Sequence, residues 1–187
     1  MVPLMSLWLP ILLSAVAVFV ASSLVHMALG YHKTDYARVP DEDRAMEALR
    51  SHDLAPGDYL MPYANSGADM KDPGFLAKLN AGPRVVMTVL PRGMTPMAGL
   101  LGKWFVFNLI VSLFAAYLAS RVLAAGTPYL TVFRVAGTIV FAGYGLGVWP
   151  QAIWFGKSTT ATVKSTFDGF LYAIVSGGVF GWLWPSV

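Results

Sequence analysis

The sequence contains no cysteine among its 187 residues. This absence excludes disulfides, thiolate nucleophiles, iron–sulfur clusters and Cys-ligated zinc sites. Charged residues are also scarce, at 12%, whereas hydrophobic residues make up 56% of the chain. The mean hydropathy is +0.59. This composition is typical of an integral membrane protein. The net charge is only +3 and the basic residues form no run, so we expect no nucleic acid partner.

Motifs for catalysis and cofactor binding are absent as well. The sequence has no nucleophile beside a base, no pair of acids, no His–Glu metal motif and no glycine-rich phosphate loop. The later apolar runs hold no chain of acids of the kind that proton-coupled transporters use. We therefore expect a protein that is not an enzyme and that binds no cofactor.

Four apolar runs predict four membrane-spanning helices. A bilayer core needs about 20 helical residues. Residues 8–30 supply 23 without an acid, Lys or Arg, and the other runs cover about 100–123, 129–150 and 166–184. We expect the first run to be retained rather than cleaved, because no positive residue precedes it. The predicted fold is an all-α four-helix membrane bundle, with residues 1–30 as the first helix and 101–187 as a three-helix region.

The last apolar run carries a face of small residues. Gly169, Ala173, Gly177 and Gly181 follow one another at intervals of four, which places them on one side of a helix. In a bilayer such a face lets two helix backbones approach closely. A shorter pair, Gly143 and Gly147, occurs in the third run. We predict that these six residues form helix-packing interfaces, and we call the first four the small-residue face.

Residues 31–100, between the first and second runs, predict a small extramembrane α+β domain. A helix is expected to open at residues 40–43, where acids lie at the positive end of its dipole. Residues 59–63 and 84–90 read as strands, and 73–79 as a short helix begun by proline. A domain of this size has a small core, so we expect it to pack against the membrane helices or against a partner.

Aromatic and basic residues at the ends of the runs predict anchors at the membrane interface. Arginines near the ends of helices can extend their charge to the interface. Ser165 to Asp168 matches a capping box in type, so Asp168 is expected to cap the fourth helix. The predicted anchors are Trp104, Arg121, Arg134, Trp149, Trp154 and Trp184.

The distribution of cations predicts an orientation. The side of the large loop carries more of them than the opposite side, which has Arg121 and Arg134. By the positive-inside rule, residues 31–100 then lie in the cytoplasm and both termini lie outside. The cations on the loop side are Lys33, Arg38, Arg92, Lys103, Lys157 and Lys164.

Three segments carry a resemblance to a known group. Residues 22–35 (SSLVHMALGYHKTD), 126–138 (GTPYLTVFRVAGT) and 168–185 (DGFLYAIVSGGVFGWLWP) resemble uncharacterised small four-span bacterial inner-membrane proteins. The resemblance implies a four-span fold and a location in the bacterial inner membrane. It implies no activity, and it assigns no functional residue.

Two histidines are the candidates for a metal site. His26 is expected at membrane depth near the end of the first span, and His32 follows at the interface with Asp35 nearby. Ionisable residues inside a membrane indicate function. The alternative is structural, with a neutral imidazole bonded to a neighbouring helix. Because no other histidine occurs in the later spans, haem bound by this chain alone is not expected.

The absence of chemical groups, together with the packing faces, favours one functional hypothesis over two others. We expect a non-catalytic accessory or scaffold subunit of a larger membrane complex, in contact with lipids and with other membrane protein subunits. The first alternative is a small transporter or channel component. The second is a membrane protein that handles metal or lipid, for which a metal at His26 and His32 would be the discriminating observation.

Overall fold

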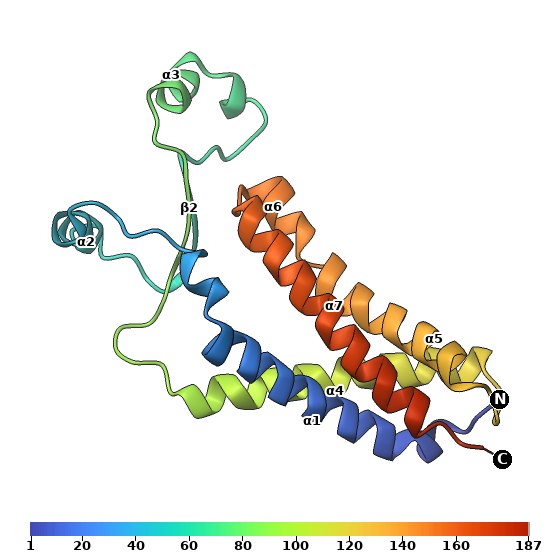
Figure 1. Ribbon diagram of the computed structural model, residues 1–187. Helices are drawn as coiled ribbons and strands as arrows, with labels where there is room; N and C mark the ends of the chain where they lie inside the picture. The colour runs from blue at the N-terminus through green and yellow to red at the C-terminus, as the bar shows by residue number, and fades with distance from the viewer. Residues whose placement is uncertain (187) are drawn as a thin grey trace. The chain divides into compact units, whose positions relative to one another are not determined.

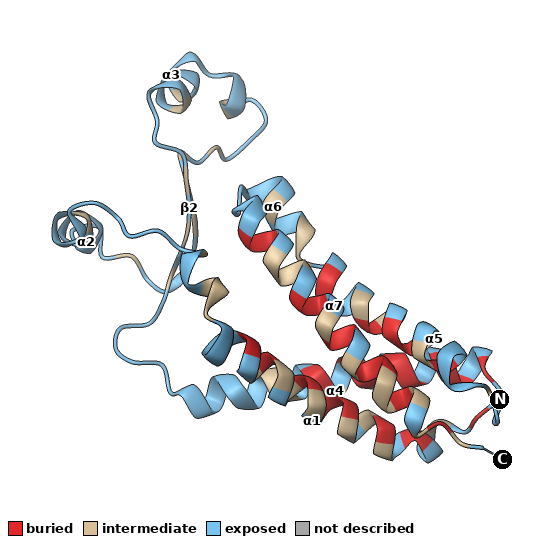
Figure 2. Ribbon diagram, viewed as in Figure 1, coloured by how far each residue is buried: buried red, intermediate tan, exposed pale blue. Residues whose placement is uncertain are grey.

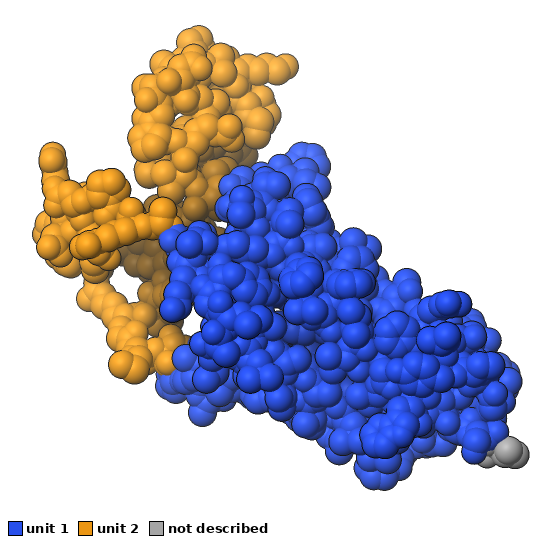
Figure 3. All heavy atoms as spheres, in the orientation of Figure 1, with its two compact units in different colours: residues 1–36, 96–187 blue, residues 37–95 orange. Residues whose placement is uncertain are grey.

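The computed structural model describes residues 1–186, which form two compact units (Figure 3). Unit 1 comprises Met1–Tyr36 and the chain from Pro96 onward, and unit 2 comprises Ala37–Thr95. Residues 31–36, which we expected in the extramembrane domain, therefore belong with the long helices of unit 1. Figure 1 shows the course of the chain through the two units.

Unit 1 contains three helical stretches that are long and apolar enough to cross a membrane, which makes the chain a multi-pass membrane protein. They are Leu4–Leu29, Met97–Val122 and Tyr129–Phe155, with mean hydropathies of 2.3, 1.7 and 1.4. Each contains 26 or 27 residues, above the roughly 20 that a bilayer core requires. The fourth run that we expected to span lies in a helix of 24 residues and is not among these three stretches.

Two of these stretches contain π-helical turns. Helix α1 (Trp8–Leu24) continues into the π turn η2 (Val25–Leu29), and α5 (Tyr129–Phe141) continues into the π turn η5 (Ala142–Leu146). Helix α6 (Trp149–Phe155) follows, so the third stretch is not the uninterrupted helix expected at 129–150. Three glycines lie within 143–147 and lower the helical preference there, and Pro150 starts a new helix in its first turn.

Helix α7 (Thr159–Trp182) begins earlier than the expected start at 166. Its N-cap is Ser158, whose hydroxyl accepts a hydrogen bond from the Ala161 amide at 3.3 Å. The Ser165 hydroxyl donates to the Ala161 carbonyl one turn earlier at 3.1 Å, so Ser165 is accommodated inside a helix. The expected cap at 165–168 is wrong, because an earlier serine already satisfies the free amides.

The other long helix, α4 (Met97–Val122), packs against α1, and α7 packs against both α1 and α5. Figure 2 shows buried residues on the facing sides of these helices and exposed residues on their outer sides. Large apolar side chains lie on the outer sides, including Val20, Phe114 and Phe170, each about half exposed. Such an apolar exterior suits contact with lipid.

Helices α5 and α7 approach so closely that several positions of α7 leave no room for a side chain larger than that of glycine. A Cβ atom on Gly169 would lie 2.6 Å from the backbone of Gly145, and one on Gly177 would lie 2.8 Å from the Phe133 carbonyl oxygen. A Cβ atom on Gly181 would lie 2.8 Å from the ring of Tyr129. Three members of the small-residue face thus lie directly against α5 or the π turn that follows it.

The close approach is mutual. A Cβ atom on Gly137 of α5 would lie 3.2 Å from the carbonyl oxygen of Ala173, the fourth member of the small-residue face. Ala173 is itself buried. Both backbones therefore contribute to the contact, which is where dispersion packing between helices is strongest.

Three serines join α1, α4 and α7 in the interior. The Ser14 hydroxyl donates to Ser176 at 2.8 Å, and the Ser112 hydroxyl donates to Ser14 at 3.2 Å. All three side chains are buried. Buried hydroxyls that bond to one another avoid the free-energy cost of unpaired polar groups.

Unit 2 contains the elements expected from local sequence patterns. They are α2 (Glu42–Arg50), β1 (Gly57–Met61), α3 (Pro73–Ala81) and β2 (Val85–Val89). The strands pair antiparallel, with Leu60 opposite Val86. The predicted helices and strands are confirmed, although the first strand begins and ends two residues earlier than the expected 59–63. Every residue of unit 2 is described, and none is buried, so the unit has no core of its own.

The packing of α7 predicts that alanine destabilises the protein at one of two adjacent glycines and not at the other. Gly177→Ala should lower the stability of the protein by about 1–3 kcal/mol, because the new methyl group meets a carbonyl of α5 that cannot move freely. Gly178→Ala is the matched control, since its methyl group would lie 3.6 Å from the Tyr129 hydroxyl, an ordinary contact. Thermal unfolding in detergent measures both, and equal transition temperatures would contradict the packing argument.

Candidate functional site

A reversal of the chain after α1 brings Tyr31 and His32 back toward α7. Gly30 adopts a left-handed conformation with φ +63°, which glycine enters without steric cost. A short 3-10 turn, η3 (Tyr31–Thr34), follows directly and contacts α7. The glycine is therefore required by the turn that positions His32.

The carboxylate of Asp168 lies buried at the point where this turn meets α7. Its side chain is 5% exposed. The Tyr31 hydroxyl donates a hydrogen bond to Oδ1, and His32 Nε2 lies 2.8 Å from Oδ2. We had predicted a capping role for Asp168, and this is wrong because the residue lies well inside α7 and is bonded to side chains of another segment. A buried carboxylate requires such partners, since an unpaired charge in the interior is costly.

A second carboxylate and a lysine extend the contact. His32 Nδ1 lies 2.6 Å from Asp35 Oδ2, and Lys164 Nζ donates to Asp35 Oδ1 at 2.9 Å. The same ammonium donates to the Tyr31 carbonyl at 2.7 Å and to the Thr34 hydroxyl at 2.8 Å. We call Tyr31, His32, Asp35, Lys164 and Asp168 the polar cluster.

The electrostatics of the polar cluster define which groups carry protons. Hydrogen bonds from His32 and then Lys164 hold the pKa of Asp35 below its ordinary value. Burial, followed by the bond to Asp168, raises the pKa of Tyr31 above its ordinary value. Tyr31 therefore stays a donor and Asp35 stays ionised. Each ring nitrogen of His32 faces a carboxylate oxygen, and both nitrogens donate only in the imidazolium form.

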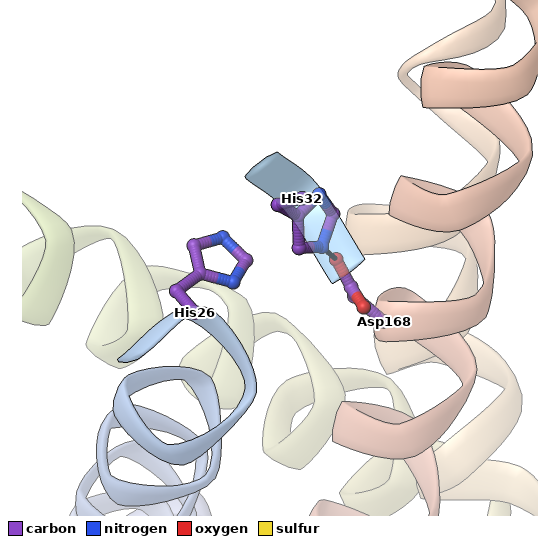
Figure 4. A group of neighbouring side chains, drawn as sticks. All are labelled: His26, His32 and Asp168. Atoms are coloured by element: carbon purple, nitrogen blue, oxygen red, sulfur yellow. Dashed lines mark hydrogen bonds and ion pairs between the residues drawn. The ribbon is translucent and has the colours of Figure 1, made fainter. Parts of the chain in front are cut away.

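His26 completes a group of three side chains with metal-binding atoms. It lies in the π turn η2, is exposed, and its ring centroid is 4.5 Å from that of His32. One ligand atom from each of His26, His32 and Asp168 lies within 4.8 Å of the others. In Figure 4, His32 lies between the other two, with His26 coming from the end of α1 and Asp168 from α7. The structure thus brings together the two predicted metal candidates and adds a carboxylate.

A pocket of about 360 Å³ opens beside this group. Four of its walls are aromatic rings, Trp104, Phe107, Tyr144 and Tyr172, which meet largely edge to face at centroid distances of 5.3–6.3 Å. His26, Ser165 and Asp168 supply the polar part of the lining. The remaining lining residues are Gly143, Gly147 and Val148.

Two predicted packing glycines and one predicted anchor lie at the pocket. Gly143 and Gly147 line the pocket, and a Cβ atom on Gly143 would face Val111 of α4 at 3.3 Å. The indole of Trp104 also lines the pocket and donates to the Ser22 hydroxyl at 2.8 Å. These residues are therefore part of the wall of a pocket, which residue spacing alone did not indicate.

The other expected anchors divide into exposed and buried residues. Trp154 is exposed and Trp149 is half-buried. Trp184 is buried, and its indole donates to the Ala124 carbonyl at 2.9 Å. Arg121 and Arg134 are exposed, and the guanidinium of Arg121 lies 5.3 Å from the ring centroid of Tyr117.

Sequence reasoning missed Tyr31, Lys164 and the true setting of Asp168. A usable signal was present, because Lys164 and Asp168 are four residues apart and lie on one face once the helix is known to begin at Thr159. With the helix start predicted at 166, Lys164 lay outside the helix, so its position on the same face as Asp168 was not recognised.

Comparisons with known proteins supply no further information about the site. No protein-family model matches the chain, and neither a curated protein nor a solved structure is significantly similar to it.

Proposed function

We propose that the protein is a membrane protein that binds a divalent transition-metal ion at His26, His32 and Asp168. The observation that carries the proposal is the convergence of three ligand atoms from separate segments within 4.8 Å. Imidazole and carboxylate ligands suit zinc, iron, nickel and copper ions. This is the metal-handling alternative that the sequence left open.

The hydrogen bonds around the three side chains support metal binding. Metal-bound histidines usually donate their second ring N–H to a carboxylate, which fixes the ring and its tautomer. Asp35 stands at that position on His32, 2.6 Å from Nδ1, and Lys164 holds Asp35 in turn. The Tyr31 hydroxyl occupies Oδ1 of Asp168, which leaves Oδ2 for the ion. A metal would replace the proton between His32 Nε2 and Oδ2.

The exposure of His26 gives the site a route for exchange of the ion. Three protein ligands leave at least one coordination position for water or another ligand, as in metal sites that are not purely structural. Because His26 is exposed and lies at the end of a membrane-length helix, an ion enters from the membrane boundary. The proposed role is therefore to hold or pass on a metal ion at the membrane surface.

The binding proposal predicts a cobalt-binding site that depends on three residues. After treatment with EDTA, the full chain in detergent should bind Co²⁺ with visible absorption bands, and Zn²⁺ should displace it. His26→Gln, His32→Gln and Asp168→Asn should each weaken binding at least roughly tenfold, since each removes a ligand. His52→Gln, which removes the one remaining histidine, in unit 2, should leave binding unchanged. A chain without cobalt bands would contradict the proposal.

We also propose that α7 crosses the membrane as a fourth span. Its C-terminal end lies beside the turn between α4 and α5, because the Gly126 amide donates to the Pro185 carbonyl at 2.8 Å. Nearer its N-terminal end, the Thr166 hydroxyl donates to the Gly145 carbonyl at 3.3 Å. Helix α7 therefore runs alongside a stretch that is long enough to span. The partners of Asp168 and Lys164 offset the cost of their charges.

Single-cysteine labelling tests this topology in a chain without native cysteine. With four spans, Ser66→Cys and Ser158→Cys should react on one side, and Thr127→Cys and Ser186→Cys on the other. The proposed cytoplasmic position of unit 2 in a bacterial inner membrane further predicts that Ser66→Cys is protected from an impermeant maleimide in intact spheroplasts. Labelling of Ser186→Cys together with Ser158→Cys would show that α7 does not cross.

The accessory-subunit hypothesis is a second candidate function, favoured by the absence of buried residues in unit 2. None of its residues is buried, and a two-stranded hairpin is marginally stable by itself. Leu60 and Val86 lie opposite each other in the hairpin and are each about half exposed. Burying them against another membrane subunit would supply apolar contact that the unit lacks.

Purification in mild detergent tests the second candidate. Another membrane protein should co-purify with the chain and should be lost when Leu60→Asp and Val86→Asp are combined, because charges block apolar burial. Met94→Asp, at a nearly fully exposed position, should retain the partner. A lone monomer from native membranes would rule out the accessory role.

A further inference from the structure

The aromatic pocket beside the metal-binding group is built by both π-helical turns of unit 1. The turn η2 contributes His26, and the turn η5 contributes Gly143 and Tyr144. π-Helical turns are rare and occur frequently at functional sites, because each inserts a residue that redirects neighbouring side chains. Two such turns from distant parts of the chain meet at one cavity.

The walls of this pocket suit a flat ring. The rings of Trp104, Phe107, Tyr144 and Tyr172 all line the cavity and pack mainly edge to face with one another. The volume of about 360 Å³ falls at the lower end of small-molecule pockets, so it fits a single substituted ring. Aromatic walls favour a flat, conjugated ring through offset or edge contacts.

The polar part of the pocket offers hydrogen-bond donors, because both oxygens of Asp168 already accept from or face Tyr31 and His32. The Tyr144 hydroxyl is already used, since it donates to Asn108 Oδ1 at 2.8 Å. Within residues 1–186, the Tyr172 hydroxyl and the His26 ring make no hydrogen bond, although both line the pocket. A ligand with an acceptor oxygen would satisfy these donors, whereas a lipid acyl chain would leave them unpaired.

We propose that this pocket binds the ring of a quinone, with a ring carbonyl accepting hydrogen bonds from Tyr172 and His26. Gly143 and Gly147 form an exposed part of the wall without side chains. A membrane quinone can therefore place its ring among the aromatic residues while its isoprenoid tail stays in the lipid. A quinone carries only acceptor oxygens, which matches the Tyr172 hydroxyl and the His26 ring, the two donors of the lining that make no hydrogen bond among the described residues.

The pocket shares His26 and Asp168 with the proposed metal site, so quinone binding and metal binding are tested separately. His32, the central residue of that site, is absent from the pocket lining. Binding is therefore measured on the full chain in detergent in the presence of EDTA. His32→Gln should abolish metal binding and retain quinone binding, so that a failure of either proposal is recognised separately.

Isothermal titration with duroquinone, a tetramethylated benzoquinone, tests the inference. We expect saturable binding of one ligand per chain. Durene, the same ring with four methyl groups and no oxygen, should bind roughly tenfold more weakly, because it cannot accept the hydrogen bonds. Equal affinities for duroquinone and durene, or no saturation with duroquinone, would overturn the proposal.

Two variants and a control connect this binding to the pocket. Gly147→Leu should weaken duroquinone binding at least roughly tenfold by filling the cavity. Gly99→Leu introduces the same side chain in α4 at a position with open space around it and should have no effect. Tyr172→Phe keeps the ring and removes the hydroxyl, and should weaken binding several-fold. Unchanged binding by both Gly147→Leu and Tyr172→Phe would contradict the assigned site.

Discussion

The buried carboxylate of Asp168 is the feature on which the arrangement of unit 1 depends. A carboxylate within an apolar helix assembly is tolerated only when hydrogen bonds and a cation offset its loss of hydration. Tyr31 and His32 supply those bonds, and they reach Asp168 because Gly30 reverses the chain after α1. Lys164, one turn before Asp168, then holds Asp35 against His32. The same contacts that stabilise the helix assembly thus hold His32 and Asp168, two of the three side chains of the proposed metal site, in place.

Close packing of α7 against α5 makes this arrangement possible. Glycine at 169 lets the π turn after α5 lie against α7 one residue beyond Asp168, since a side chain there would meet the Gly145 backbone. The π turn in turn places Tyr144 on the wall of the pocket. The small-residue face therefore serves the site as well as the stability of the membrane part. The small-residue face affects the site because it lets the backbone of α7 approach the backbone of the π turn η5. No polar motif in the sequence would indicate this effect.

The sequence predicted features that depend on neighbouring residues and missed those that depend on distant ones. The elements of unit 2 follow from local signals, such as Pro73 at the start of α3 and the valine-rich run of β2. The pair formed by His32 and Asp168 joins residues 136 positions apart, and no spacing rule connects them. At the start of α7, both Ser158 and Ser165 are residues of the type that caps a helix. The structure uses Ser158 as the N-cap. Trp104 was expected at the lipid interface. The sequence could not show that its indole donates a hydrogen bond to Ser22, because Ser22 lies on another helix.

The coupling free energy between His32 and Asp168 tests the central claim most directly. It is obtained by measuring the unfolding free energy in detergent for the unaltered chain, His32→Gln, Asp168→Asn and the double variant, all without metal. A buried charged hydrogen bond predicts that the two single effects fail to add by about 1–3 kcal/mol. Additive effects within a few tenths of a kcal/mol would show that the two residues do not interact, and would contradict the account of the site.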